Sequence, residues 1–294
     1  MLTNPTFLFI QALNSLALGM NLFIIASGLT LIFGVLRVVN FAHGAFFMLG
    51  AYVSFSAATW TGSFWIGLAA AVAVLAACGW AIERGLLRLL YEREPLTQLL
   101  FTFALVLILG DVAKIVWGTD QHTVSYPPGL DGAVDLGIAY FPAYSLLLCL
   151  LGPAVAAGLW LLVEHTRWGR VMRAATEDRE MVAALGIDAS RVSAGVFAAG
   201  AALAGAGGAL AAPRVALTPG MDATVIVDCF IIVIIGGLGS LWGSFLGALL
   251  LGFVTVFGVV LLPEAELVLP YLMMVGLLLW RPWGLFGREE VERA

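Results

Sequence analysis

The sequence predicts an all-α integral membrane protein built as one polytopic helical bundle. Hydrophobic residues make up 62% of the 294 residues and charged residues only 11%, whereas a water-soluble domain is about half apolar and a quarter charged. The mean hydropathy is +1.02, and the apolar residues are spread over nearly the whole chain. We therefore expect a single transmembrane domain over residues 1–294, although the length alone would allow two soluble domains.

Apolar stretches long enough to cross a bilayer, which takes about 20 residues, follow one another along the chain. Together with a shorter piece they predict about 8–9 membrane segments. The first stretch is too long for one straight crossing, which predicts a tilt or a break near Gly28. A glycine-rich turn after the shorter piece predicts a short or re-entrant helix near 224–235. The expected full segments are 7–35, 41–60, 64–82, 96–117, 142–163, 191–212, 243–262 and 266–280.

The basic residues predict how the bundle is oriented. With the N-terminus outside and the C-terminus cytoplasmic, all basic residues except Lys114 and Arg214 fall on the cytoplasmic side. The loops expected outside, 118–141 and 263–270, are acidic. The basic residues expected in the cytoplasm are Arg37, Arg84, Arg88, Arg93, Arg167, Arg170, Arg173, Arg179, Arg191, Arg281, Arg288 and Arg293.

Two interruptions of the hydrophobic pattern lead into apolar helices in a similar way. One runs from Asn40 to Gly44 and the other from Gly236 to Gly243, and each continues with a small residue and a Phe. Discontinuous helices in corresponding halves favour a substrate pathway, because freed backbone groups must face a cavity or protein. Close helix packing at glycine explains the pattern equally well. The candidate pathway residues are Asn40, His43, Gly44, Asp228, Gly236, Gly237, Gly239 and Ser240.

Two titratable residues in these segments leave alternatives open. His43 either lines a polar pathway or is a hydrogen-bonded structural histidine. A metal site is not expected, because His122 and His165 lie in separate loops. Asp228 either lines the pathway, pairs with Arg214 or sits at the membrane interface, since ionisable groups at membrane depth usually face the bundle interior.

The sequence does not predict an enzyme. Lys114 is the only lysine, and no Gly-Lys-Ser/Thr is present, so the chain has no P-loop. Lys114 follows Asp111 by three residues, which predicts an ordinary ion pair on one helical face. No nucleophile–base arrangement occurs in a polar context, and no basic cluster suggests nucleic-acid binding. If ATP drives this protein, another subunit must hydrolyse it.

The long cytoplasmic loop 164–190 contains a predicted short amphipathic helix. Thr176 suits its N-cap, Glu177 and Asp178 its first turn, and Gly186 its C-cap. The apolar stripe at helical spacing is formed by Met181, Val182, Ala184 and Leu185.

This loop resembles the coupling loop of ABC importer permeases, in which a helix docks into a groove on the ATPase. An interfacial helix lying on lipid would show the same pattern. If the resemblance holds, the coupling residues are Arg173, Ala174, Ala175, Glu177, Asp178, Glu180, Leu185 and Gly186.

Three stretches in order, 28–52, 177–187 and 235–243, resemble the LivH-type branched-chain amino acid ABC transporter permeases. The resemblance implies a permease subunit in the bacterial inner membrane that forms the translocation pathway for Leu, Ile and Val by alternating access. It implies four kinds of partner: the lipid bilayer, a second LivM-like permease, two ABC ATPase subunits that use ATP, and an extracytoplasmic substrate-binding protein. No cofactor is expected on this chain.

Two alternatives remain beside this interpretation. Relatives with similar motifs handle urea or short amides, so an importer of those substrates is the first alternative. A stand-alone secondary transporter or channel is the second. Asp228 and the pair Asp111 and Lys114 are the features that favour it.

Overall fold

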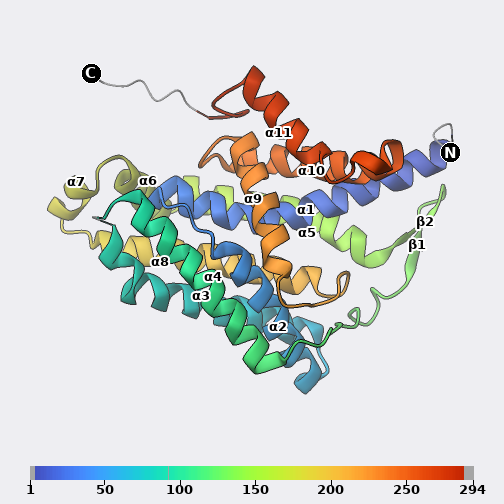
Figure 1. Ribbon diagram of the computed structural model, residues 1–294, viewed down its shortest axis with the longest axis horizontal. Coiled ribbons are helices and arrows are strands. Elements are labelled where there is room, and N and C mark those ends of the chain that lie inside the picture. Colours follow the sequence, from blue (N-terminus) through green and yellow to red (C-terminus); the bar gives the residue numbers. More distant parts are fainter. Residues whose placement is uncertain (1–3, 92, 288–294) are drawn as a thin grey trace.

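The computed structural model describes residues 4–91 and 93–287 as a bundle of helices with one small two-stranded sheet (Figure 1). The two strands are antiparallel, with Val134 opposite Phe141. The elements are α1 (Pro5–Leu36), α2 (His43–Thr61), α3 (Phe64–Gly85), η1 (Leu87–Leu90), α4 (Pro95–Trp117), β1 (Ala133–Asp135), β2 (Tyr140–Pro142), α5 (Ala143–His165), α6 (Arg167–Glu177), α7 (Arg179–Ala184), α8 (Ala189–Ala211), α9 (Met221–Gly236), α10 (Leu241–Leu261), η2 (Pro263–Ala265) and α11 (Leu269–Trp280).

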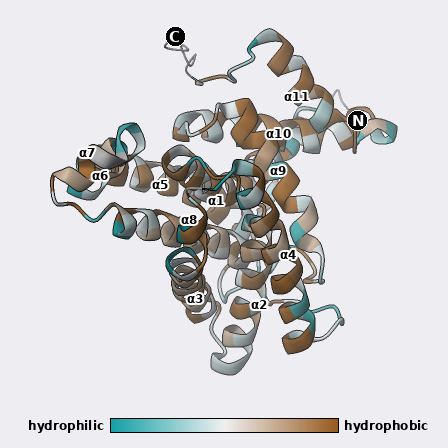
Figure 2. Cartoon of the chain, turned by 60° about the vertical axis from the view of Figure 1, so that its left-hand side comes forward, coloured by the Kyte–Doolittle hydropathy of each residue, from teal (hydrophilic) through white to brown (hydrophobic). Residues whose placement is uncertain are grey.

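Each apolar segment expected from the sequence corresponds to one of these helices. Six helices in the described part of the chain are long and apolar enough to cross a membrane: α1, α3, α4, α5, α8 and α10. In Figure 2 the hydrophobic colour covers most of these long helices. The prediction of a polytopic helical membrane protein is therefore confirmed. The expected count of 8–9 segments depends also on α2, α9 and α11, and it stays a prediction.

The core of the bundle is built by α1, α2 and α8. All residues from Gly19 to Ile32 in α1 and from His43 to Tyr52 in α2 are buried. Both helices contact α8, where the ring of Phe197 meets the ring of Phe46 edge to face at 5.9 Å between centroids. By contrast, α11 buries none of its residues. Small residues in α8 allow α1 and α2 to approach it closely, as is common where helices associate in a membrane.

Of the tilt or break predicted near Gly28, the break is wrong. α1 is one continuous helix of 32 residues, roughly 48 Å long at 1.5 Å per residue. A Cβ on Gly28 would lie 2.5 Å from the carbonyl oxygen of Gly200 in α8. Gly28 therefore lets α1 and α8 touch, and it does not interrupt the helix. A helix of this length exceeds the roughly 30 Å hydrocarbon core, so it must tilt or project from the bilayer.

The connections expected in the cytoplasm gather at one end of the molecule. Leu31 near the end of α1, Met172 of α6 and Val192 near the start of α8 share one apolar cluster. α3 runs antiparallel to α8, because Gly79 faces Ala201 while Gly205 faces Leu75. The end of α3 therefore lies beside the start of α8. In Figure 1 this end, with α6 and α7, is on the left.

The loop after α4, which is expected outside, meets the loop after α8 at the opposite end. His122 and Leu217 form an isolated bridge in which each backbone N–H donates to the other residue's carbonyl oxygen, at 3.1 and 2.9 Å. This bridge ties the loop after α4 to the loop after α8. β1 and β2 lie at the right of Figure 1, away from α6 and α7. The predicted orientation of the bundle stays a prediction; Arg288 and Arg293 lie outside the described residues.

Candidate functional site

The α6 helix is fixed to the bundle where the predicted coupling loop begins. The hydroxyl of Thr166 caps the helix by accepting a hydrogen bond from the Gly169 N–H at 3.0 Å. Arg173 forms an ion pair with Glu164 of α5 across the corner. Met172, the residue before Arg173, is 3% exposed and packs in the apolar cluster with Leu31. A displacement of α6 would therefore change its contacts with α1 and α8.

The short helix α7 begins two residues later than the sequence predicts. Thr176 is not its N-cap, because α6 continues through Glu177 and the Thr176 hydroxyl donates to the Met172 carbonyl at 3.0 Å. Asp178 has extended backbone angles and is the actual N-cap. Its carboxylate accepts a hydrogen bond from the Met181 N–H at 2.8 Å.

Gly186 ends α7 as predicted. Its φ is +80°, a left-handed conformation that a residue with a Cβ adopts at a cost. The Gly186 N–H donates to the carbonyl of Ala183 at 3.0 Å, and the Ile187 N–H donates to that of Val182 at 3.3 Å. These two bonds are the Schellman motif, which stops a helix sharply. α7 is therefore a short helix with a hydrogen-bonded cap at both ends.

The predicted apolar stripe of α7 is divided between two faces. Val182 is 3% exposed, whereas Met181 is 58% and Leu185 72% exposed. Because Met181 and Leu185 are four residues apart on one helix, they form a single surface, here called the α7 patch. Of the other predicted coupling residues, Ala174, Glu177, Asp178 and Gly186 are exposed and Arg173 and Ala175 half-buried. The side chain of Glu180 lies outside the described part of the structure.

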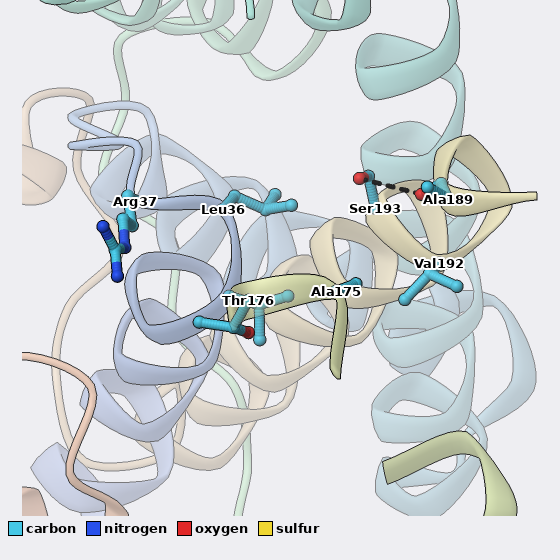
Figure 3. A pocket seen from close by; sticks show the side chains of 8 residues that line it. Leu36, Arg37, Ala175, Thr176, Ala189, Val192 and Ser193 are labelled. Carbon is cyan, nitrogen blue, oxygen red and sulfur yellow. Dashed lines mark hydrogen bonds between the residues drawn. The ribbon is translucent and has the colours of Figure 1, made fainter. Parts of the chain in front are cut away.

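A partly open cavity of about 190 Å³ lies where the end of α6 meets α1 and α8. In Figure 3, Leu36 and Val192 border it from opposite sides, with Ala175 between them and Thr176 on the side of Leu36. Protein interiors are otherwise close-packed. The cavity is an exception to this close packing, and it lies beside the end of α6, directly before α7.

The predicted pathway residues fall into two groups that are connected by α9. At the start of α2, a Cβ on Gly44 would lie 2.5 Å from the Asp222 carbonyl oxygen in α9. At the other end of α9, a Cβ on Gly236 would lie 2.4 Å from the carbonyl carbon of Gly243. The close-packing interpretation of these glycines is thus confirmed. Asn40, His43 and Gly44 form the first group, and Gly236, Gly237, Gly239 and Ser240 the second, with Asp228 between them on α9.

His43 makes a hydrogen bond inside the bundle, which agrees with its interpretation as a structural histidine. Its side chain is fully buried, and its Nε2 lies 2.8 Å from the carbonyl oxygen of Ile25. Asn40 is also fully buried, in the linker before α2. The next residue, Phe41, packs its ring against Phe230 of α9 at 4.9 Å between centroids. The linker is therefore part of the core and contacts α9.

Asp228 is half-buried in the middle of α9, and of its three alternatives the pairing with Arg214 does not occur. Thr224, one turn earlier and exposed, was missed by the sequence reasoning, although its spacing of four residues from Asp228 could have indicated it. The local ion pair between Lys114 and Asp111 is confirmed at 3.0 Å, and both side chains are exposed.

Comparison with known proteins identifies the family of this chain. The model described as "Branched-chain amino acid transport system / permease component" matches residues 11–278. The high-affinity branched-chain amino acid transport system permease protein BraD of Pseudomonas aeruginosa is 30% identical over 96% of this chain and 97% of its own length. LivH of Escherichia coli strain K12, a permease protein of the same description, is 29% identical over 96% of each chain.

LivM of Escherichia coli strain K12, also named as a branched-chain amino acid permease protein, is 26% identical over 89% of this chain and 67% of its own length. No solved structure matches the chain. The match to the family model over most of the sequence, together with the similarity to BraD and LivH, shows that this chain belongs to the branched-chain amino acid transport permease family.

Proposed function

We propose that this chain is the permease subunit of an ATP-driven ABC importer and forms half of the translocation pathway for leucine, isoleucine and valine. Its similarity to BraD and LivH supports the substrate class. Its weaker similarity to LivM supports pairing with a second, homologous permease. We place the N-terminus outside and the C-terminus in the cytoplasm of a bacterial inner membrane, because basic residues then face the cytoplasm.

The α7 patch is the observation that carries the proposal. An exposed apolar pair on a short, capped helix, at the end of the molecule that carries the basic residues, is suited to a groove on another protein. In the proposed mechanism this partner is the ATPase. ATP-driven closure pushes α7, and α6 transmits the movement to α1 and α8 through Met172. The cavity beside Ala175 accommodates the shift.

In this mechanism, movement of α9 opens and closes the translocation pathway. α9 contacts α1, α2 and α10, and Figure 1 shows it crossing α1 rather than running alongside it. Movement of α1 and α2 therefore reaches α9 at Phe41 and Gly44. Loaded binding protein docks on the acidic outer loops. The two permeases then open to each side in turn.

A charge placed in the α7 patch tests this function. Leu185→Asp should lower leucine uptake by the reconstituted importer at least tenfold, because a carboxylate in an apolar groove costs about 2–5 kcal/mol. The control is Leu89→Asp, at a side chain in η1 that is 71% exposed on the same side of the molecule. Leucine affinity of the binding protein should be unchanged in both. Full uptake by well-inserted Leu185→Asp would contradict the proposed coupling.

A further inference from the structure

One face of α9 points away from the rest of the chain. Ala223 and Thr224 are exposed, and Val227 and Asp228 are half-buried. These four residues recur at helical spacing and so lie on one side of the helix. We call them the α9 stripe. The opposite side of α9 is buried in the bundle through Ile226, Cys229, Ile232 and Val233.

The direction of the α9 stripe is set by contacts at both ends of the helix. Backbone meets backbone at Gly44 against Asp222 and at Gly236 against Gly243, at distances that leave no space for a methyl group. The ring of Phe230 is held by Phe41. α9 cannot rotate within the chain without breaking these contacts. The stripe therefore remains on the outer surface of this subunit, where a neighbour, lipid or water must cover it.

Asp228 makes lipid an unfavourable cover for the stripe. A carboxylate at the centre of a membrane helix costs about 2.5–3.5 kcal/mol. No hydrogen bond or ion pair within the described residues compensates Asp228. The compensating group must therefore come from outside this chain. In a transporter, such residues mark the route of a charged or polar substrate.

Branched-chain amino acids carry an α-ammonium group, an α-carboxylate and an aliphatic side chain. The α9 stripe matches the ammonium group and the side chain: Asp228 supplies a negative charge, Thr224 one helical turn away supplies a hydroxyl, and Val227 supplies apolar surface beside them. Part of the Asp228 side chain stays at the surface of this subunit, where a group from outside the chain can reach it.

We propose that Asp228 and Thr224 receive the α-ammonium group of the amino acid as it passes between the two permeases. This rests on the proposed function for the identity of the substrate. The same geometry allows one competing result, in which a basic side chain of the second permease pairs permanently with Asp228.

Thiol accessibility in the complete reconstituted importer separates these outcomes. Cys78, Cys149 and Cys229 are free thiols and are first replaced by Ala. Thr224→Cys is then treated with a cationic aminoethyl and an anionic sulfonatoethyl methanethiosulfonate. We expect the cationic reagent to react about tenfold faster, since a negative charge beside a narrow aqueous path concentrates cations. Adding Asp228→Asn should remove this preference. Leu107→Cys on the exposed, apolar side of α4 should react with neither reagent.

Uptake gives the second readout. Asp228→Asn should reduce leucine uptake at least tenfold, and Asp228→Glu should restore part of it, while ATP hydrolysis stimulated by loaded binding protein persists. Leucine-loaded binding protein with ATP should slow modification of Thr224→Cys. No reaction at that position, or equal rates for both reagents with Asp228 present, would overturn the ammonium site. A third outcome is that the cationic reagent reacts faster, but modification of Thr224→Cys is slowed only by binding protein loaded with a ligand other than leucine. This outcome would overturn the proposed substrate and support the cation site.

Discussion

The Nε2 atom of His43 lies 2.8 Å from the carbonyl oxygen of Ile25, inside the fully buried contact of α1 and α2. Ile25 stands eleven residues before Leu36, where α1 ends. α2 therefore starts beside the interior of α1 and not at its end. The linker 37–42 folds back into the bundle, which brings Phe41 and Gly44 to α9.

Removing this hydrogen bond should destabilise the subunit. His43→Phe keeps the bulk of the side chain but leaves no donor for Ile25, which we expect to cost about 1–3 kcal/mol. His43→Gln keeps an N–H and should recover part of the loss. Thermal unfolding in detergent measures both. A His43→Phe subunit as stable as wild type that nevertheless fails to transport would favour a pathway role for His43 instead.

The hydroxyls of Thr30 and Ser244 are 2.6 Å apart in the buried contact of α1 and α10. A double-mutant cycle with Thr30→Val and Ser244→Ala should give a coupling free energy of about 0.5–1.5 kcal/mol, the range of side-chain hydrogen bonds between membrane helices. Additive single effects in the unfolding measurements would show that the two hydroxyls do not stabilise one another.

Glycines in the α2–α8 contact should tolerate no methyl group. A Cβ on Gly208 would lie 2.0 Å from the Phe47 carbonyl oxygen, so Gly208→Ala should push the helices apart and cost about 1–3 kcal/mol or more. Gly110, in the middle of α4, has nothing within 4 Å of its Cβ position. Gly110→Ala should be neutral or stabilise by up to about 1 kcal/mol. Equal losses of unfolding free energy in both variants would be inconsistent with the close contact.

Hydropathy alone predicted the positions of the long apolar helices, because each helix that crosses a bilayer requires one long run of apolar residues. The stop at Gly186 was also predictable, since a left-handed terminal residue favours glycine. Gly28 was misinterpreted for a physical reason. A glycine in an apolar helix is compatible with a break and with close packing, and Gly200, which decides between them, lies far away in the sequence.

Side-chain exposure was the least predictable feature. The pattern of α7 predicted one stripe, but only the structure shows that Val182 turns inward while Leu185 turns outward. The N-cap was misplaced because Thr176 and Asp178 are both good capping residues, and the choice depends on where α6 ends. The pairing of Asp228 was likewise undecidable, because it depends on how α9 packs.

The proposed orientation can be tested by labelling whole cells. In a chain without its native cysteines, Ile138→Cys between β1 and β2 should react with a membrane-impermeant maleimide in cells whose outer membrane has been permeabilised. Leu89→Cys should react only after the inner membrane is also opened. Both side chains are well exposed. The reverse pattern would show that the bundle is inserted the other way round.

ATP dependence of uptake tests the central claim most directly. The measurement is leucine uptake into proteoliposomes that contain this chain and its partner permease, with and without the two ATPases, in the presence of binding protein and enclosed ATP. The account predicts uptake only with the ATPases, and its loss with a non-hydrolysable ATP analogue. Equal uptake without the ATPases, driven by an ion gradient or by none, would contradict it and identify a stand-alone transporter or channel.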